Sequence, residues 1–317
     1  MRVFLTGMAG FSGGAVATAL ARAGHDVTAL LRAPRPGMAA RTVLGDLTRP
    51  DEWRAALDGQ DAVIHLAAFN PPRLSRAARD EAAMTAVNVE ASVALARVAV
   101  AAGVPRFVFA SSVRVYGIGN TAPFREGDPL SPDDPYARSK AAAEASLREI
   151  LHGPGRALAI LRLPVIHGPG RGGWLGLAAR LGQHGWLFPP VLGQAPKSVL
   201  NRDNLAAALS VLMRNDAPAV NGIFNLADDG VTSLEGIGRL AGQAAGHARM
   251  SALPGLPGAL LDALPFAGAA LAHARRPCVV DTARFAAATG WTPPVTLAAG
   301  LAASFAGRKR PAAAEAC

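Results

Sequence analysis

The sequence predicts an α/β protein with a Rossmann-type, doubly wound parallel sheet and a smaller, discontinuous substrate-binding lobe. Short apolar segments alternate with Ala-rich amphipathic segments up to about residue 165, a pattern typical of a parallel sheet covered by helices on both faces. Glycines at positions 7, 10 and 13 follow the first apolar segment directly. After position 167 the composition shifts toward Gly, Pro and Trp, which indicates a crossing into a second region.

The individual elements follow from these segments. We expect strands at residues 3–6, 27–31, 42–44, 62–67, 106–111, 157–161 and 222–226, and helices at 13–23, 81–102 and 204–213. Asp133, Asp134 and Pro135 predict the start of another helix, because acidic residues and proline are favoured in a first helical turn. The apolar stretch 253–272 contains three prolines and an aspartate, so we expect a buried or lid-like helical segment rather than a membrane span. Contact with a membrane surface is the alternative.

The helix at 204–213 and the strand at 222–226 return to the sheet, which makes the lobe discontinuous. We assign residues 1–167 and 201–227 to a dinucleotide-binding domain, and residues 168–200 and 228–307 to the lobe. Residues 308–317 form a basic, Ala-rich tail.

Composition limits the classes of function. The chain has 317 residues, half of them hydrophobic, which is enough for a large core. Its two cysteines, Cys278 and Cys317, fit a reducing cytoplasm and offer neither a disulfide framework nor metal-ligand spacing, so we expect no metal. The first strand begins at once, so we expect no signal peptide. The net charge of +9 is scattered, which favours anionic small molecules, phosphates above all, over nucleic acid.

The glycine turn predicts a dinucleotide site. Gly7, Gly10 and Gly13 stand between the first strand and the first helix. Glycines in such a turn allow a tight bend, close approach of a pyrophosphate to backbone N–H groups, and close packing of helix on strand. Gly7, Ala9, Gly10 and Phe11 are therefore candidate cofactor contacts.

Tyr136 and Lys140 form the candidate catalytic pair. Four residues apart on a helix, they lie on one face, where the lysine ammonium can favour ionisation of the phenol. The positive partial charge of a helix N-terminus favours the phenolate as well. Ser112 stands at the end of the strand at 106–111, so the three side chains together indicate a redox site.

Several motifs, in a fixed order, make the chain resemble the extended short-chain dehydrogenase/reductase family, the nucleotide-sugar epimerases and dehydratases. They include the Gly-x-x-Gly-x-x-Gly spacing at 7–13, Ser-Ser-Val-Arg-Val-Tyr-Gly at 111–117, and Tyr-Ala-Arg-Ser-Lys at 136–140. The others are Gly45-Asp46-Leu47, His65-Leu66-Ala67-Ala68, Val87-Asn88-Val89-Glu90, Leu161-Arg162-Leu163-Pro164 and Gly290-Trp291-Thr292-Pro293.

This resemblance implies roles for the matching residues. Asp46 and Leu47 would border the adenine, and Ala67, Ala68 and Leu163 would line the cofactor. Ser112, with Val113 beside it, would contact the substrate and hydrogen-bond the reacting oxygen. Tyr136 would transfer the proton, while Lys140 would lower the pKa of the tyrosine and bind the nicotinamide ribose. Asn88 would support a water-linked proton path; a helix kink or cap is the alternative for this residue.

The resemblance is greatest to bacterial UDP-glucose 4-epimerase-like proteins. Lys197, which opens the run Lys-Ser-Val-Leu-Asn-Arg-Asp-Asn-Leu, takes the place of a basic residue that grips the substrate diphosphate. Arg275 and Arg276 are further candidates for the same anion. Dehydration is not expected, because Val113 and Arg114 replace the acidic pair of the 4,6-dehydratases. His167 is either a polar substrate contact or a histidine satisfied by a neighbouring backbone group.

The function predicted is an NAD(P)-dependent nucleotide-sugar epimerase of the UDP-hexose 4-epimerase type, in which hydride moves to and from the nicotinamide. The alternatives are an NADPH-dependent reductase of a keto-sugar or other ketone and, outside enzymes, a dinucleotide-sensing protein. Arg32 stands at the end of the second strand, where a carboxylate would repel a 2′-phosphate, so we expect NADP(H) to be accepted at least as well as NAD(H). We expect a cytoplasmic homodimer.

Overall fold

The computed structural model describes residues 1–35, 37, 40–72, 75–117, 119–170, 172–214, 219–255 and 268–305. The predicted tail at 308–317 and most of the apolar stretch at 253–272 lie outside these residues. The main feature is a seven-stranded parallel sheet in the order β10-β6-β5-β4-β1-β2-β3, which confirms the predicted fold class. Its strands are β1 (Arg2–Thr6), β2 (Asp26–Leu31), β3 (Arg41–Leu44), β4 (Ala62–His65), β5 (Arg106–Ser112), β6 (Ala157–Leu163) and β10 (Gly222–Asn225). Each overlaps a predicted strand.

The strand order reverses beside β1, which pairs with β2 on one side and with β4 on the other. In open α/β sheets, ligands bind outside the carboxyl ends of the strands at such a switch point. Thr6 and His65 are register partners at the ends of β1 and β4, and β5 ends nearby at Ser112. We therefore expect the predicted cofactor site at this edge.

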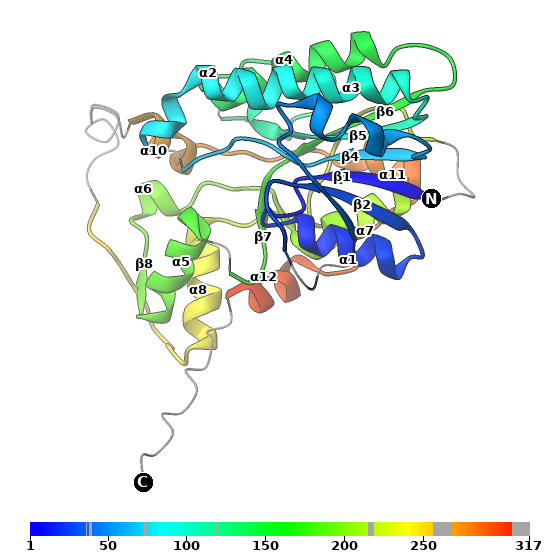
Figure 1. Cartoon of the computed structure of the whole chain (residues 1–317). Helices are drawn as coiled ribbons and strands as arrows, with labels where there is room; N and C mark the ends of the chain where they lie inside the picture. Colours follow the sequence, from blue (N-terminus) through cyan, green and yellow to red (C-terminus); the bar gives the residue numbers. More distant parts are fainter. Residues whose placement is uncertain are drawn as a thin grey trace.

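Helices cover both faces of the sheet (Figure 1). The helices α1 (Gly13–Arg22) and α7 (Arg202–Leu212) pack together on one face, and α3 (Ala91–Ala101) and α4 (Pro135–Ile150) pack together on the other. Successive residues of β1 enter different cores: Leu5 packs in the α1 and α7 core, whereas Phe4 packs in the α3 and α4 core. Burial on both faces explains why the strands read as continuous apolar runs.

The predicted helix at 81–102 is interrupted. A short α2 (Glu81–Met84) is followed by a π-helical segment (Thr85–Glu90) and then by α3. Within the described residues, Glu81–Ala101 is also the helical stretch long and apolar enough to cross a membrane, with a mean hydropathy of 1.4. Because this stretch packs on α4 and contributes to the sheet's core, we interpret it as a helix of the protein body.

The second lobe lies beside the carboxyl edge of the sheet (Figure 1). Its helices are α5 (Gly173–Gln183), α6 (Pro190–Gly193), α8 (Leu234–Ala244), α10 (Gly268–Arg275) and α12 (Leu297–Phe305). Two small parallel sheets join β8 (Trp186–Leu187) to β11 (Ser251–Ala252), and β7 (Val165–His167) to β9 (Val199–Asn201). Where α5 crosses α8, a Cβ on Gly182 would lie 1.9 Å from the Gly238 carbonyl oxygen, so glycine is required for this approach.

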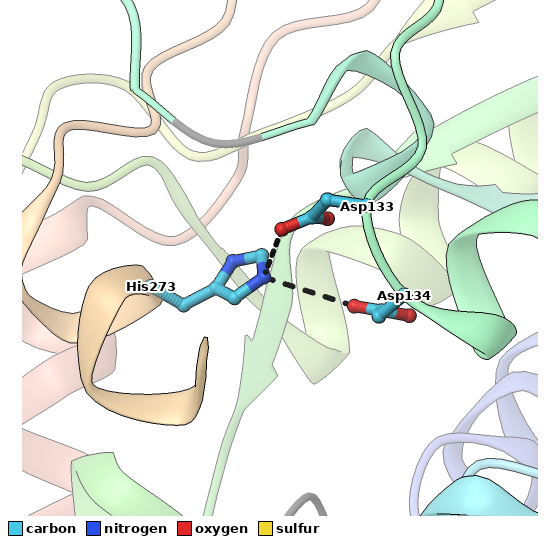
Figure 2. Close-up of side chains that lie close together, drawn as sticks. All are labelled: Asp133, Asp134 and His273. Atoms are coloured by element: carbon cyan, nitrogen blue, oxygen red, sulfur yellow. Dashed lines mark ion pairs between the residues drawn. The ribbon is translucent and has the colours of Figure 1, made fainter. Parts of the chain in front are cut away.

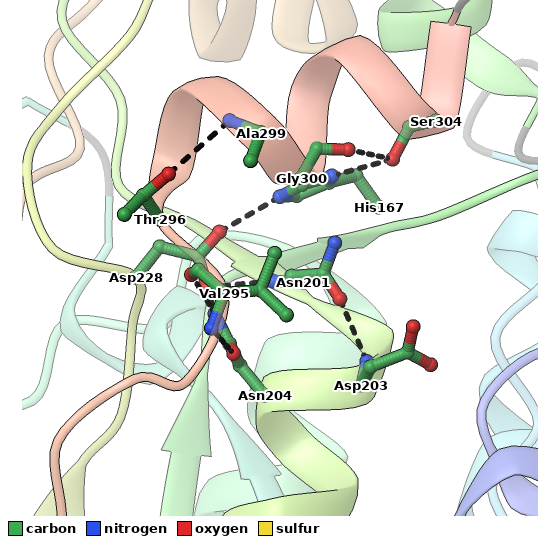
Figure 3. A network of polar contacts seen from close by, with 10 residues as sticks. All are labelled: His167, Asn201, Asp203, Asn204, Asp228, Val295, Thr296, Ala299, Gly300 and Ser304. Atoms are coloured by element: carbon green, nitrogen blue, oxygen red, sulfur yellow. Dashed lines mark hydrogen bonds and ion pairs between the residues drawn. The ribbon is translucent and has the colours of Figure 1, made fainter.

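A buried polar network joins β7, α7 and α12 (Figure 3). Asp228 lies at its centre: Oδ2 is 2.8 Å from Nε2 of His167, and Oδ1 accepts hydrogen bonds from the Asn201 N–H and from Nδ2 of Asn204. His167 Nδ1 lies 2.9 Å from Oγ of Ser304 on α12. The ring is fully buried and both nitrogens have protein partners. His167 is therefore satisfied inside the protein, as the second alternative predicts, but its partners are the side chains of Asp228 and Ser304 and not a backbone group.

One later helix returns to the sheet. In α11 (Ala283–Thr289), Phe285 packs edge-on against Phe224 of β10 and against Trp291. This helix lies in the range 228–307 that the sequence assigns to the lobe, yet it packs in the core of the sheet. The rest of the domain division stays a prediction.

Candidate active site

The end of β5 positions the first part of the site. After Ser112 the chain makes a 3-10 turn (Val113–Tyr116) and leaves it at Gly117, whose φ of 91° favours glycine. The Ser112 hydroxyl accepts a hydrogen bond from the Arg114 N–H at 3.2 Å and so caps the turn. Both Ser112 and Val113 are buried at the carboxyl edge of the sheet. Their contacts with a substrate stay predictions.

The helix α4 begins where the Asp-Asp-Pro run predicted. The Asp134 carboxylate accepts a hydrogen bond from the Ala137 N–H at 2.8 Å, and Pro135 occupies the first helical position, which needs no N–H donor. This cap fixes Tyr136 in the first turn and Lys140 one turn later. Both of these side chains are buried.

Burial is the main influence on Tyr136. It raises the pKa of the phenol to about 12, because the phenolate loses its hydration. The Arg114 guanidinium lowers this pKa and the Asp134 carboxylate raises it. The Cζ atom of Arg114 lies 4.7 Å from the centroid of the Tyr136 ring. Sequence reasoning noted Arg114 only as the replacement of an acidic residue and missed this contact.

Lys140 is held at the carboxyl end of β5. Its ammonium donates a hydrogen bond to the Ala110 carbonyl oxygen at 2.7 Å and lies 4.3 Å from the centroid of the Phe109 ring. Burial lowers the pKa of Lys140 to about 7, and the charge of Glu144 raises it in part. Its predicted effects on the phenol and on the cofactor ribose stay predictions.

Asn88 lies in the π-helical segment and is fully buried. Its Oδ1 accepts a hydrogen bond from the Phe69 N–H at 2.7 Å, and its Nδ2 donates to the Phe69 carbonyl oxygen and to Oγ of Ser139. The Ser139 hydroxyl in turn donates to the Tyr136 carbonyl oxygen. These contacts favour the helix-kink alternative, because an irregular helical turn and the start of α4 both depend on this amide.

A second buried polar chain, which sequence reasoning missed, lies beneath the glycine turn. His65 Nδ1 is 2.6 Å from Oγ1 of Thr6, and its Nε2 is 2.8 Å from Oγ of Ser92. Since the Ser92 hydroxyl donates to the Asn88 carbonyl oxygen, the network assigns the hydrogen to Nε2 of His65. Burial lowers the pKa of His65 to about 3, so the ring is neutral. This chain fixes the ends of β1 and β4 against α3.

The turn between β1 and α1 fits a dinucleotide. Gly7 has a φ of 81°, and a Cβ there would lie 2.5 Å from the Ala67 backbone nitrogen. A Cβ on Gly13 would lie 2.2 Å from the Gly7 carbonyl oxygen. At Gly10, the Gly7 oxygen at 3.1 Å is the one described atom that a Cβ would meet within 4 Å, so the space beyond it is open. This is the place at the N-terminus of α1 where the pyrophosphate of NAD would bind.

Other predicted cofactor residues surround the same edge. Arg32 and Asp46 line an open pocket of about 360 Å³ together with Leu44, Gly45, Arg49 and Glu52. Hydrogen bonds from the N–H and hydroxyl of Thr48 lower the pKa of Asp46, which is therefore held as the carboxylate. Leu47 is buried in the core next to the pocket. Ala67 and Ala68 follow β4, and Leu163 ends β6. Phe11 lies under the Arg202 guanidinium. Their contacts with the cofactor stay predictions.

Lys197 occupies a different position from the one expected for a simple phosphate contact. Its ammonium donates hydrogen bonds to the carbonyl oxygens of His273, at 2.5 Å, and Arg276, at the C-terminal end of α10. A lysine at this place complements the negative end of the helix. Arg275 and Arg276 lie at the same helix end, so the three predicted diphosphate residues are brought together. Their contact with a substrate stays a prediction.

The helix α10 also contacts the start of α4 (Figure 2). Nε2 of His273 lies 2.9 Å from Oδ2 of Asp133 and 3.7 Å from Oδ2 of Asp134. These three side chains are of metal-ligand type, but the Asp134 carboxylate already pairs with the Arg114 guanidinium. We interpret the cluster as a polar bridge between the lobe and the start of α4.

The sequence comparison decides the family. Residues 3–227 match the model of the NAD dependent epimerase/dehydratase family. The chain belongs to this family. It is an NAD-dependent enzyme of the extended short-chain dehydrogenase/reductase type, which excludes the dinucleotide-sensing alternative.

Parts of this chain are similar to individual characterised proteins. The UDP-glucose 4-epimerase of Vibrio cholerae is 29% identical over 188 residues, which cover 58% of this chain and 57% of that protein. The 3 beta-hydroxysteroid dehydrogenase/Delta 5-->4-isomerase of Mycobacterium tuberculosis is 38% identical over 153 residues, which cover 45% of this chain and 41% of that protein. The chain thus spans about half the length of these two relatives.

The whole fold is found in solved structures. MoeE5 in complex with UDP-glucuronic acid and NAD matches with a TM-score of 0.79 at 23% identity, covering 96% of this chain and 98% of that chain. At this level of identity the likeness shows the fold, and it includes the lobe as well as the sheet domain.

Proposed function

We propose that this family member is a nucleotide-sugar epimerase of the UDP-hexose 4-epimerase type, with Tyr136 as its acid and base. The observation that supports the proposal is the placement of the three residues on two contacting elements: Ser112 ends β5, Tyr136 and Lys140 lie one turn apart on α4, and Lys140 donates a hydrogen bond to the Ala110 carbonyl oxygen of β5. NAD, when bound there, supplies the hydride acceptor and donor. The relative from Vibrio cholerae, a UDP-glucose 4-epimerase, supports the choice of substrate class.

The chain's own residues handle the proton. The phenolate of Tyr136 takes the proton of a substrate hydroxyl during oxidation, and the phenol so formed gives it back during reduction. A positioned acid or base of this kind contributes roughly 100- to 10,000-fold in rate. Ser112 orients the reacting oxygen from the end of β5. Lys140, one turn after Tyr136 on α4, favours ionisation of the phenol and would bind the nicotinamide ribose. The buried position of all three keeps bulk water from the reacting centre.

The end of α10 is the proposed diphosphate site. Lys197 fixes this helix end through its bonds to the carbonyl oxygens of His273 and Arg276, and Arg275 and Arg276 are the cations next to it. A phosphate is well matched by guanidinium groups, which bind it through paired N–H donors. The positive net charge of the chain favours an anionic substrate as well.

A reductase of a keto-sugar or other ketone is the second candidate. Two observations favour it: the pocket at the end of β2 contains Arg32 and Arg49, which suit the 2′-phosphate of NADP(H), and one relative is a steroid dehydrogenase. The same catalytic residues would serve this reaction, since only the fate of the ketone differs. We further propose a homodimer, because Val93 and other apolar residues of α3 are only partly buried in the single chain. A cytoplasmic location is proposed separately, because the two cysteines of the chain fit a reducing compartment.

The nucleotide that stays bound during purification tests the choice between the two. We expect tightly held NAD and interconversion of UDP-glucose and UDP-galactose without added cofactor. Exchangeable NADP(H), with consumption of NADPH on addition of a ketone and no interconversion of UDP-sugars, would instead identify the reductase.

A further inference from the structure

Arg114 lies between the catalytic tyrosine and the start of its helix. Its Cζ is 4.7 Å from the centroid of the Tyr136 ring, and its Nε donates a hydrogen bond to Oδ2 of Asp134 at 3.0 Å. Each side chain of this ion pair is only 18% exposed. Because Asp134 also caps α4, the guanidinium is anchored to the same turn that carries Tyr136.

We propose that Arg114 is a positioning residue for the reaction: its guanidinium, fixed by Asp134 over the ring of Tyr136, supplies a positive charge that favours the phenolate. This inference rests on the proposed role of Tyr136 as acid and base. Water screens charges poorly at a partly buried site, so a cation within about 5 Å of the ring acts strongly on the ionisation of the phenol. A guanidinium over the face of an aromatic ring is itself a favourable contact.

The neighbouring lysine explains why such a cation is needed. Lys140 is directed to the Ala110 carbonyl oxygen and the Phe109 ring, and its lowered pKa of about 7 leaves a share of the molecules without this charge at neutral pH. Arginine stays protonated throughout this range. Arg114 therefore keeps one positive charge beside Tyr136 whatever the protonation state of Lys140.

The acidic groups that face the same turn define the test. Asp134 opposes the phenolate, and His273 of α10 approaches the carboxylates of both Asp133 and Asp134 (Figure 2). Removing Arg114 leaves Tyr136 beside an uncompensated carboxylate, whereas removing the charge of Asp134 leaves it beside an uncompensated guanidinium. The two substitutions should shift the pKa of Tyr136 in opposite directions, which a purely structural role would not do.

Carbon NMR of protein labelled at the tyrosine ζ-carbon measures this directly. The chain has two tyrosines, so Tyr136→Phe assigns the signals. In the NAD-bound protein without substrate, Arg114→Met should raise the pKa of Tyr136 by at least about one unit, which is tenfold less phenolate at a given pH. Arg114→Lys should raise it by less. Asp134→Asn should lower the pKa of Tyr136, because the opposing negative charge is removed while asparagine still caps the helix.

Arg284→Met is the matched control, because Arg284 lies over another ring, 5.4 Å from the centroid of Phe224, and the Tyr136 pKa should not change. Shifts in the same direction for Arg114→Met and Asp134→Asn, or shifts below about 0.3 unit, would overturn the inference. If Arg114→Met does not fold, Arg114→Lys and Asp134→Asn decide the matter. The titration needs no substrate, so absence of UDP-sugar epimerisation would reject the proposed function separately.

Discussion

Glu144 and Arg162 form a buried ion pair, with Oε2 and Nη2 2.7 Å apart and side chains that are 2% and 3% exposed. Glu144 follows Lys140 by one turn of α4, and Arg162 belongs to β6, so the pair ties this helix to the sheet. The Ser111 hydroxyl donates a further hydrogen bond to Oε1 of Glu144, and the guanidinium lies over the ring of Tyr116. Both charges are thus satisfied where water has little access.

Glu144→Gln should lower the free energy of unfolding by about 3–5 kcal/mol, because the buried Arg162 loses its counter-charge. Urea unfolding measures this change. The control is Glu81→Gln. It removes the exposed partner of Arg138, which also lies on α4, and should change stability by less than about 1 kcal/mol. Equal effects of the two substitutions would contradict the role given to the buried pair.

Tyr136→Phe should reduce turnover by roughly 100- to 10,000-fold while NAD still binds, because the ring packs as before but no proton can move. Ser112→Ala should reduce turnover less. Tyr116→Phe is the matched control: it removes the other phenol, which donates a hydrogen bond to Oδ1 of Asn225, and should leave most of the activity. Steady-state kinetics with calorimetric titration of NAD separates the two effects, and more than about half the activity remaining in Tyr136→Phe would refute the proton-transfer role.

The lowered pKa of Lys140 makes stability depend on pH. Between about 7 and the ordinary value of 10.5, the unfolded chain binds a proton that the folded protein does not, so the free energy of unfolding should rise with pH there. The destabilisation is fully present below this window. Lys140→Met should be more stable at neutral pH and lose that rise, whose slope is at most about 1.4 kcal/mol per pH unit. Urea unfolding across the window should therefore give different slopes for the two proteins; parallel curves would show that Lys140 is not held uncharged by burial.

The pocket at the end of β2 predicts that NADP(H) binds at least as tightly as NAD(H). Arg32→Ala should weaken NADP binding by about tenfold, since a charge-assisted contact with the 2′-phosphate contributes about 1.5–3 kcal/mol, and should leave NAD binding nearly unchanged. Dissociation constants for both nucleotides provide the measurement. A tenfold preference for NAD that persists in Arg32→Ala would reject the idea.

Lys197→Met should raise the KM for a UDP-sugar by roughly tenfold with little change in kcat, because the diphosphate is held equally in the ground and transition states. Some loss of thermal stability should accompany this, as the end of α10 loses its cation. Thr232→Ser is the comparison variant, because the backbone of Thr232 pairs with that of Lys197, and it should leave KM unchanged. Absence of UDP binding at millimolar concentration in the intact holoenzyme would favour a small uncharged ketone as the substrate.

The sequence by itself determined the features that depend on neighbouring residues. The apolar runs of β1 and β5, the glycines that tolerate the turn after Thr6, and the Asp-Asp-Pro start of α4 each express a local conformational preference, and all three are present in the structure. These elements, with the family motifs, were sufficient for the fold class and for the family, because the alternation of strand and helix predicts a parallel sheet covered by helices.

Only the tertiary structure decided which charges meet. Arg114 lies over Tyr136, Lys197 caps α10, and His167 is satisfied by Asp228, although in each case the partners come from different elements. The return of α11 to the sheet was likewise not evident from its sequence. The physical reason is that burial and electrostatic interaction depend on distances through space, and those distances are set by the packing of whole elements rather than by the residues next to each side chain.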